Sequence, residues 1–152
     1  MNSIISLVVS FIVCFAAAAI GTRFLPDEWF KNLNKPSWNP PNRLFAPVWT
    51  ILYALMAIAA WQVSEQAGVK AVPLLALFVV QLAMNAAWTW IFFGLRLPDR
   101  AFAEIVVLWV LIAATLIGFW QMNPLAGLLL LPYLAWVTFA SFLNLTIWRL
   151  NR

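Results

Sequence analysis

The stretch IVVLWVLIAATLIGFWQMNPLAGLLLLPYLAWVTFASFLNLTIW, residues 105–148, carries no charged side chain over 44 residues. An α-helix rises about 1.5 Å per residue, so roughly 20 apolar residues cross the hydrocarbon core of a bilayer. The stretch is about twice that length, and Asn123-Pro124 interrupts it near its middle, where proline ends one helix and starts the next. It therefore predicts two consecutive spanning helices, over 100–121 and 124–148.

The rest of the chain has the same apolar character. Of its 152 residues 65% are hydrophobic and 9% are charged, which leaves too little polar surface for a water-soluble domain. Further uncharged runs predict spanning helices at 3–22, 44–64 and 71–95. The expected fold is all-α, a polytopic five-transmembrane-helix bundle that forms one domain over 1–152. A β-barrel would need alternating polar and apolar positions, and runs such as LLALFVV do not alternate.

The basic residues predict how the chain lies in the membrane. The segments after the first, third and fifth spans hold eight of the nine lysines and arginines. The positive-inside rule then places the N-terminus outside and the C-terminus in the cytoplasm of a bacterial inner membrane. The first three residues carry no Lys or Arg, so we expect residues 1–22 to be a span and not a cleaved signal peptide. The net charge of +4 follows from this asymmetry, so the expected partner is the lipid bilayer and not nucleic acid.

The chain offers few groups for metal or acid–base chemistry. It has no histidine, which is the usual ligand of haem and zinc and the usual general base. Its single cysteine, Cys14, lies in an apolar run and is expected to pack there. We expect no metal and no cofactor.

One connection is long. Residues 23–43, RFLPDEWFKNLNKPSWNPPNR, join the first two spans. Connections of more than about 12 residues are usually functional lids or disordered linkers, and this one is rich in apolar side chains, unlike a linker. The prolines of KPSWNPP fix the backbone and lower the entropy cost of ordering it. The segment is either a lid over a binding site or an interfacial anchor with its tryptophans in the headgroup region.

Polar side chains share one face of the third span. Gln81, Asn85 and Trp88 or Thr89 follow helical spacing. Because unpaired amides in hydrocarbon are costly, this face must look into the bundle. It either joins helices by hydrogen bonds or lines a cavity.

Two further spans carry aromatic faces with amides or small residues among the rings: Trp49 and Tyr53 in the second, and Tyr133, Trp136, Ala140 and Asn144 in the fifth. Together with the apolar loop they predict a pocket for a flat, mostly apolar ligand. The first span has small residues at Ser6, Ser10, Ala17 and Gly21, a spacing that permits either a homodimer contact or close packing within the chain.

Three segments resemble the translocator protein family, also called tryptophan-rich sensory proteins or peripheral-type benzodiazepine receptors (TspO/MBR). They are LPDEWFKNLNKPSWNPPNRLFAPVWTILY, QLAMNAAWTWIFFG and LLPYLAWVTFASFLN. The resemblance implies five transmembrane helices, usually a homodimer, and a pocket closed by the first loop. It also implies binding of porphyrins such as protoporphyrin IX, of cholesterol in animal members, and of synthetic ligands.

The resemblance also implies pocket positions, which by motif are Phe30, Pro40, Trp49, Tyr53, Asn85, Trp88, Thr89, Trp136 and Ala140. Phe30 and Pro40 rest on the resemblance alone. The loop and the helix faces add five positions to the predicted ligand-binding set: Trp38, Pro41, Gln81, Tyr133 and Asn144. The family's sterol motif needs a basic residue soon after a tyrosine, but the first one after Tyr133 is Arg149, so the pattern is not met.

The leading hypothesis is a membrane receptor or sensor that binds porphyrins and regulates tetrapyrrole metabolism or transport. The alternative is an enzyme that degrades porphyrin with light and oxygen, using Trp49 and Trp136. The sequence supplies no evident acid–base pair or metal site for ordinary turnover, which favours the receptor.

Overall fold

The computed structural model describes residues 2–152, and all regular structure in that part of the chain is helical. Five helices have 18 residues or more: α1 (Ser3–Gly21), α3 (Phe45–Ala67), α4 (Val72–Thr89), α5 (Pro98–Met122) and α6 (Pro124–Leu150). The shorter elements are α2 (Glu28–Lys31), the 3-10 helices η1 (Asn42–Leu44) and η2 (Gly68–Ala71), and the π-helix η3 (Trp90–Gly94).

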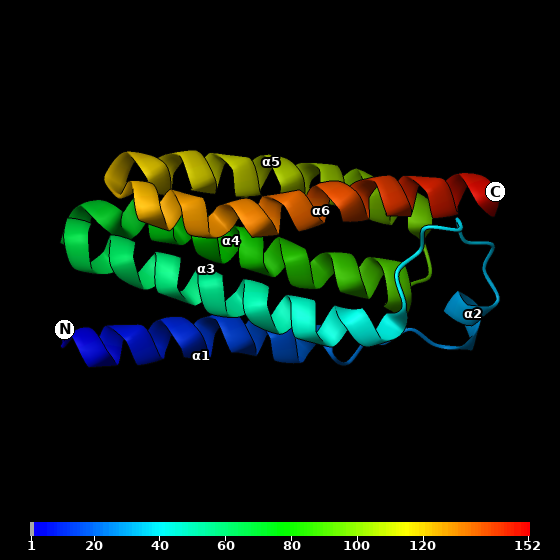
Figure 1. The fold of residues 1–152 in the computed structure, drawn as a ribbon, viewed down its shortest axis with the longest axis horizontal. Helices are drawn as coiled ribbons and strands as arrows, with labels where there is room; N and C mark the ends of the chain where they lie inside the picture. The colour runs from blue at the N-terminus through cyan, green and yellow to red at the C-terminus, as the bar shows by residue number, and fades with distance from the viewer. Residues whose placement is uncertain (1) are drawn as a thin grey trace.

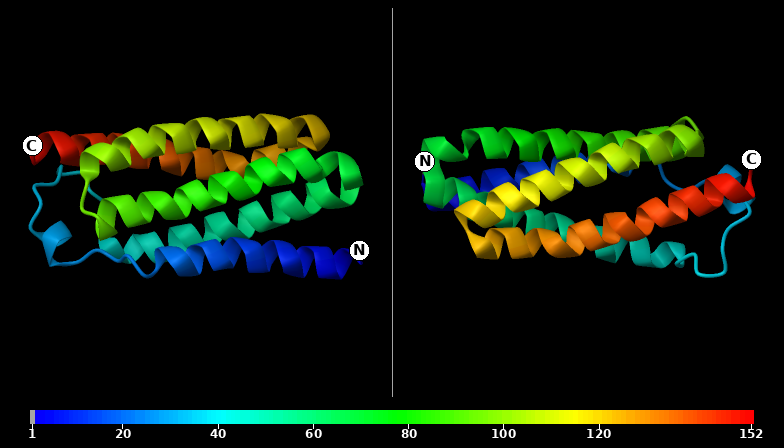
Figure 2. Two further views of the ribbon diagram at one scale, coloured as in Figure 1. Left: turned by 180° about the vertical axis from the view of Figure 1, so that it is seen from behind. Right: turned by 90° about the horizontal axis from the view of Figure 1, so that it is seen from above.

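The long helices lie side by side along the long axis of the molecule (Figure 1). Helices in contact follow one another around the bundle in the order α1, α3, α6, α5, α4 and back to α1. The N-terminus lies at one end, and the C-terminus lies at the other, beside α2 and the connection between α1 and α3 (Figures 1 and 2). This connection therefore covers one end of the bundle.

The outer surface of the bundle is apolar. Four helical runs in residues 2–152 are long and apolar enough to cross a membrane, and one of them is the 53-residue run Asn42–Gly94, which contains both α3 and α4. At most 33% of each apolar window is buried, and side chains such as Ile4, Ile51 and Ile117 remain exposed. Such an apolar outer surface is typical of an integral membrane protein.

The break between α5 and α6 follows from two residues. The Asn123 side chain accepts a hydrogen bond from the Leu125 N–H at 3.0 Å, which caps α6, and Pro124 occupies its first position. The chain therefore reverses at this point, as the sequence predicts.

Two local features differ from the sequence-based expectations. The segment 23–43 is not an uninterrupted loop, because the Asp27 side chain accepts from the Phe30 N–H at 3.3 Å and so caps the short helix α2. The helix expected over 71–95 changes to π geometry at Trp90. The Phe24 ring packs so closely on Gly94 that an added Cβ would lie 2.9 Å from it, so any larger residue at the end of the π-helix would require this ring to shift.

Candidate functional site

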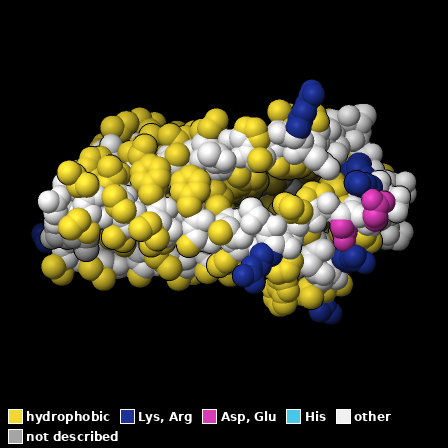
Figure 3. Space-filling model, turned by 90° about the horizontal axis from the view of Figure 1, so that it is seen from below, with side chains coloured by type: hydrophobic (Ala, Val, Ile, Leu, Met, Phe, Trp, Pro, Cys, Tyr) yellow, Lys and Arg dark blue, Asp and Glu magenta, His cyan; other side chains and the backbone are white. Residues whose placement is uncertain are grey.

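A cavity of about 770 Å³ lies among α1, α3, α4 and α6, next to the connection between α1 and α3. It opens as a hollow on one side of the molecule, toward the end that carries this connection (Figure 3). None of its lining residues comes from α5. Its volume lies in the range of small-molecule sites, which are mostly apolar with a few polar groups.

The cavity brings together nine of the fourteen predicted ligand-binding residues: Phe30, Trp49, Tyr53, Asn85, Trp88, Thr89, Trp136, Ala140 and Asn144. Pro40 and Pro41 line an adjoining cavity of about 330 Å³, which shares Phe30 and Asn42 with the larger one. The remaining three, Trp38, Gln81 and Tyr133, line neither cavity.

Aromatic rings from α3 and α6 form one wall. The Trp49 ring lies edge-to-face with Trp136, with centroids 6.5 Å apart and an interplanar angle of 88°. Trp49 also packs against Tyr53 at 5.6 Å, and Phe45 contacts Trp136 edge-on at 6.1 Å. Such pairs are stabilised by about 0.5–1.5 kcal/mol beyond their burial, so the wall is held in a defined geometry before any ligand binds.

A hydrogen-bonded network forms the polar floor. Asn85 donates from Nδ2 to the hydroxyls of Tyr53 and Tyr133, each at 3.1 Å. The Tyr133 hydroxyl in turn donates to Oε1 of Gln81 at 2.7 Å. Gln81 and Tyr133 are therefore structural groups behind the wall that orient Asn85, and the network joins α3, α4 and α6.

Asn144 lines the cavity and also fixes the position of Trp88. The Trp88 indole N–H donates to Oδ1 of Asn144 at 2.9 Å, and Asn144 donates from Nδ2 to the carbonyl of Pro98 at 2.8 Å. The Trp88 ring also stacks on Phe92 at 5.2 Å. Trp88 is thus fixed from two sides and presents ring surface, because its N–H is already bonded.

Several phenylalanine and aliphatic positions of the lining are absent from the predicted set, among them Phe15, Phe24, Phe92, Phe93, Phe139 and Leu143. A usable signal existed for two of them, because Phe139 and Leu143 follow Trp136 at helical spacing on the same face of α6. Phe92 and Phe93 are neighbours in the sequence and both reach the cavity from the π-helix, which no α-helical pattern predicts.

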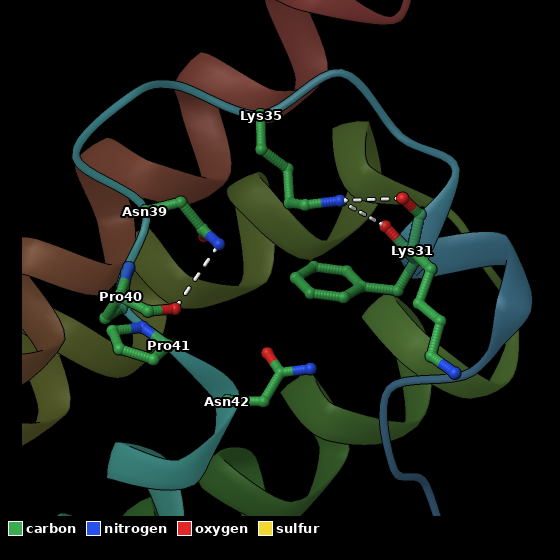
Figure 4. A pocket seen from close by; sticks show the side chains of 7 residues that line it. Lys31, Lys35, Asn39, Pro40, Pro41 and Asn42 are labelled. Atoms are coloured by element: carbon green, nitrogen blue, oxygen red, sulfur yellow. Dashed lines mark hydrogen bonds between the residues drawn. The ribbon is translucent and has the colours of Figure 1, made fainter.

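The connection between α1 and α3 is itself well ordered by Phe30 and Lys35. Phe30 is 3% exposed and contacts Phe92 and Phe93 edge-to-face at 6.1 and 5.3 Å. The Lys35 ammonium lies 4.9 Å above the Phe30 ring and donates to the carbonyls of Phe30, Lys31 and Leu33 at 2.7–3.1 Å. Figure 4 shows two of these bonds beside the prolines that line the smaller cavity.

Two polar tethers join this connection to the bundle. Asp27 pairs with Arg96 at 2.8 Å. Desolvation raises the pKa of Asp27, but the bonds from the Phe30 N–H and Arg96, with the charge of Arg96, outweigh it, so the pKa lies below its ordinary value. Asn34 donates from its backbone N–H to Oδ1 of Asn151 at 2.9 Å, and Nδ2 of Asn151 donates to the carbonyl of Asn34 at 2.8 Å.

Small residues of α1 pack partly within the chain. Ala17 is buried, and a Cβ added to Gly21 would lie 3.8 Å from Oγ1 of Thr89 on α4. Ser6 and Ser10 are half-buried. Close packing of α1 on its neighbouring helices therefore accounts for the small residues Ala17 and Gly21.

An apolar helical bundle with an aromatic cavity open on one side defines the class of this protein, a helical membrane protein with an internal pocket. Residues 7–149 match the TspO/MBR family, and the chain belongs to that family. It is 46% identical to Protein CrtK of Rhodobacter capsulatus over 145 residues, which cover 94% of this chain and 91% of that protein.

Two other relatives have names that describe a role. The chain is 45% identical to the tryptophan-rich sensory protein of Cereibacter sphaeroides over 138 residues, covering 91% of this chain and 86% of the relative. It is 41% identical to the human translocator protein over 138 residues, which cover 87% of this chain and 82% of the human protein. Membership of this family supports a membrane sensor or receptor role.

Proposed function

We propose that this protein is a membrane receptor or sensor that binds porphyrins, such as protoporphyrin IX, and other flat hydrophobic ligands, and thereby regulates tetrapyrrole metabolism or transport. The observation that carries the proposal is the cavity of about 770 Å³, walled by Trp49 and Trp136 in a member of the TspO/MBR family. Rings of this kind stack on a flat macrocycle, and the floor around Asn85 can orient it.

The membrane arrangement belongs to the same proposal. The run Asn42–Gly94 crosses the bilayer twice, as α3 and α4, so that the chain has five crossings. The N-terminus then lies outside, and the connection between α1 and α3 lies on the cytoplasmic side of a bacterial inner membrane with the C-terminus. The apolar side chains that α1 exposes support burial against lipid or a second copy in a homodimer.

Titration with protoporphyrin IX tests the proposed function. We expect binding to quench tryptophan fluorescence, and Trp136→Ala to weaken it by roughly 1–3 kcal/mol, the loss expected for one stacking aromatic residue. Trp120→Ala is the matched control, because Trp120 is half-exposed on α5 and lines neither cavity. Equal affinity of the parent and Trp136→Ala would remove this wall from the site.

The edge-to-face pair of Trp49 and Trp136 also supports a second function, the breakdown of porphyrin in light by molecular oxygen. In this alternative the two indoles take part in electron transfer with the excited macrocycle. Product formation that needs both light and oxygen, and that Trp49→Phe and Trp136→Phe abolish while binding persists, would favour the enzyme. Binding without any product under light and oxygen would favour the receptor.

A further inference from the structure

The lining of the large cavity is exposed in one region only. Six lining residues are exposed, and they stand at the end of α1, in the connection and at the start of α3: Ala19, Thr22, Leu25, Asn42, Ala46 and Thr50. The deeper residues Tyr53 and Asn85 are 6% and 3% exposed. The cavity therefore has a mouth between the end of α1 and the start of α3 and a closed floor at Asn85.

Two arginines border this mouth. Arg23 directly follows the lining residue Thr22, and Arg43 directly follows the lining residue Asn42. Both arginines are exposed. Figure 3 shows Lys or Arg side chains on both sides of the hollow, whose rim is otherwise mainly hydrophobic.

Neither arginine has an acidic partner in the part of the chain that the structure describes. The two ion pairs there are Asp27 with Arg96 and Glu28 with Lys31. The other acidic residues line neither cavity and form no ion pair with either arginine: Glu65 lies near the end of α3, and Asp99 and Glu104 lie on α5. The mouth therefore carries two positive charges that no acidic side chain neutralises.

We propose that Arg23 and Arg43 form a carboxylate-binding site that holds the acid groups of the ligand at the mouth of the cavity. This inference rests on the proposed function and adds the residues that hold the carboxylates along one edge of the flat apolar ligand. The apolar part fills the aromatic cavity, while the carboxylates stay at the membrane interface, where they avoid the cost of burying a charge. Guanidinium groups suit this role because they bind carboxylates with two parallel hydrogen bonds.

The test compares protoporphyrin IX with its dimethyl ester, which keeps the macrocycle and removes the two negative charges. Both are titrated into the protein in nanodiscs of zwitterionic lipid at low salt. For exposed charge pairs we expect Arg23→Gln and Arg43→Gln each to weaken acid binding by about three- to fivefold, and the double variant by about tenfold. Ester affinity should not change, so the ratio of acid to ester affinity should fall by the same factor.

The matched control is the double variant Arg149→Gln and Arg152→Gln. It removes the same charge from the same end of the molecule, but at exposed positions outside the cavity lining. We expect it to leave the affinity ratio unchanged. A ratio that falls equally in this control would assign the effect to net charge and overturn the site.

Three other results would also overturn the proposal. An unchanged ratio in the Arg23 and Arg43 double variant, with less anionic lipid retained through purification, would assign these arginines to lipid phosphates. If the parent protein binds neither compound, the proposed function fails as well. Tight ester binding together with an unchanged ratio rejects the carboxylate site alone.

Discussion

Replacing Asn151 with alanine should speed the release of a bound porphyrin. Asn151 makes two hydrogen bonds to the backbone of Asn34, at 2.9 and 2.8 Å, and these join the connection between α1 and α3 to the end of α6. A net contribution of about 0.5–1 kcal/mol for each exposed bond gives about 1–2 kcal/mol for the pair. If the connection must open for release, the dissociation rate constant rises about 5- to 30-fold.

The measurement is stopped-flow fluorescence, in which protein loaded with protoporphyrin IX is mixed with excess apolar acceptor vesicles. Lys31→Gln serves as the control, because it breaks the exposed pair with Glu28 in the same connection without touching the bundle. The association rate constant should change less than the dissociation rate constant in Asn151→Ala, as is usual for related variants. Equal dissociation from parent and Asn151→Ala would refute the lid and leave the connection as an interfacial anchor.

Three further predictions concern the same end of the molecule. Replacing Pro40 and Pro41 by glycine should raise the entropy cost of ordering the connection and also speed dissociation, whereas an anchor would change only thermal stability or membrane insertion. Because the pKa of Asp27 is lowered, the pairing with Arg96 is fully present above the ordinary aspartate range and is lost as pH falls through the lowered pKa. Measured with the dimethyl ester, which has no carboxylates of its own to titrate, dissociation should be constant between about pH 5 and 8 and speed up below about pH 4, and Asp27→Asn should abolish this dependence. A cysteine introduced at Arg152 should react with an impermeant maleimide only from the cytoplasmic side. Labelling from outside would show that the orientation in the membrane is the reverse of the proposed one.

Periodicity and breaking residues predict much of this fold. Asn123 and Pro124 mark the turn between α5 and α6, and spacing along α3 and α6 selects Trp49 and Trp136, which share one cavity wall. These inferences succeed because a helical face that combines rings and polar groups cannot favourably point into lipid.

The remaining features depend on contacts between distant parts of the chain. Asn34 meets Asn151 across 117 residues, and Trp88 meets Asn144 across 56. Spacing within one helix shows which face is buried but not which partner lies opposite, so the bond from Trp88 to Asn144 could not be predicted, although Asn144 does line the cavity. The π-helix that begins at Trp90 also could not be predicted, because its number of residues per turn differs from that of the α-helix on which such patterns depend.

The internal bonding of the cavity has a consequence for ligand discrimination. The N–H of Trp88 is already donated to Asn144, and Asn85 donates to two tyrosine hydroxyls. A site with unpaired buried polar groups rejects analogues that cannot bond to them, but bonds already made inside the protein exert no such selection. Among uncharged compounds, which do not engage Arg23 and Arg43, a screen should therefore return molecules that share size and planarity more than any pattern of hydrogen-bonding groups, and they should compete with one another for a single site.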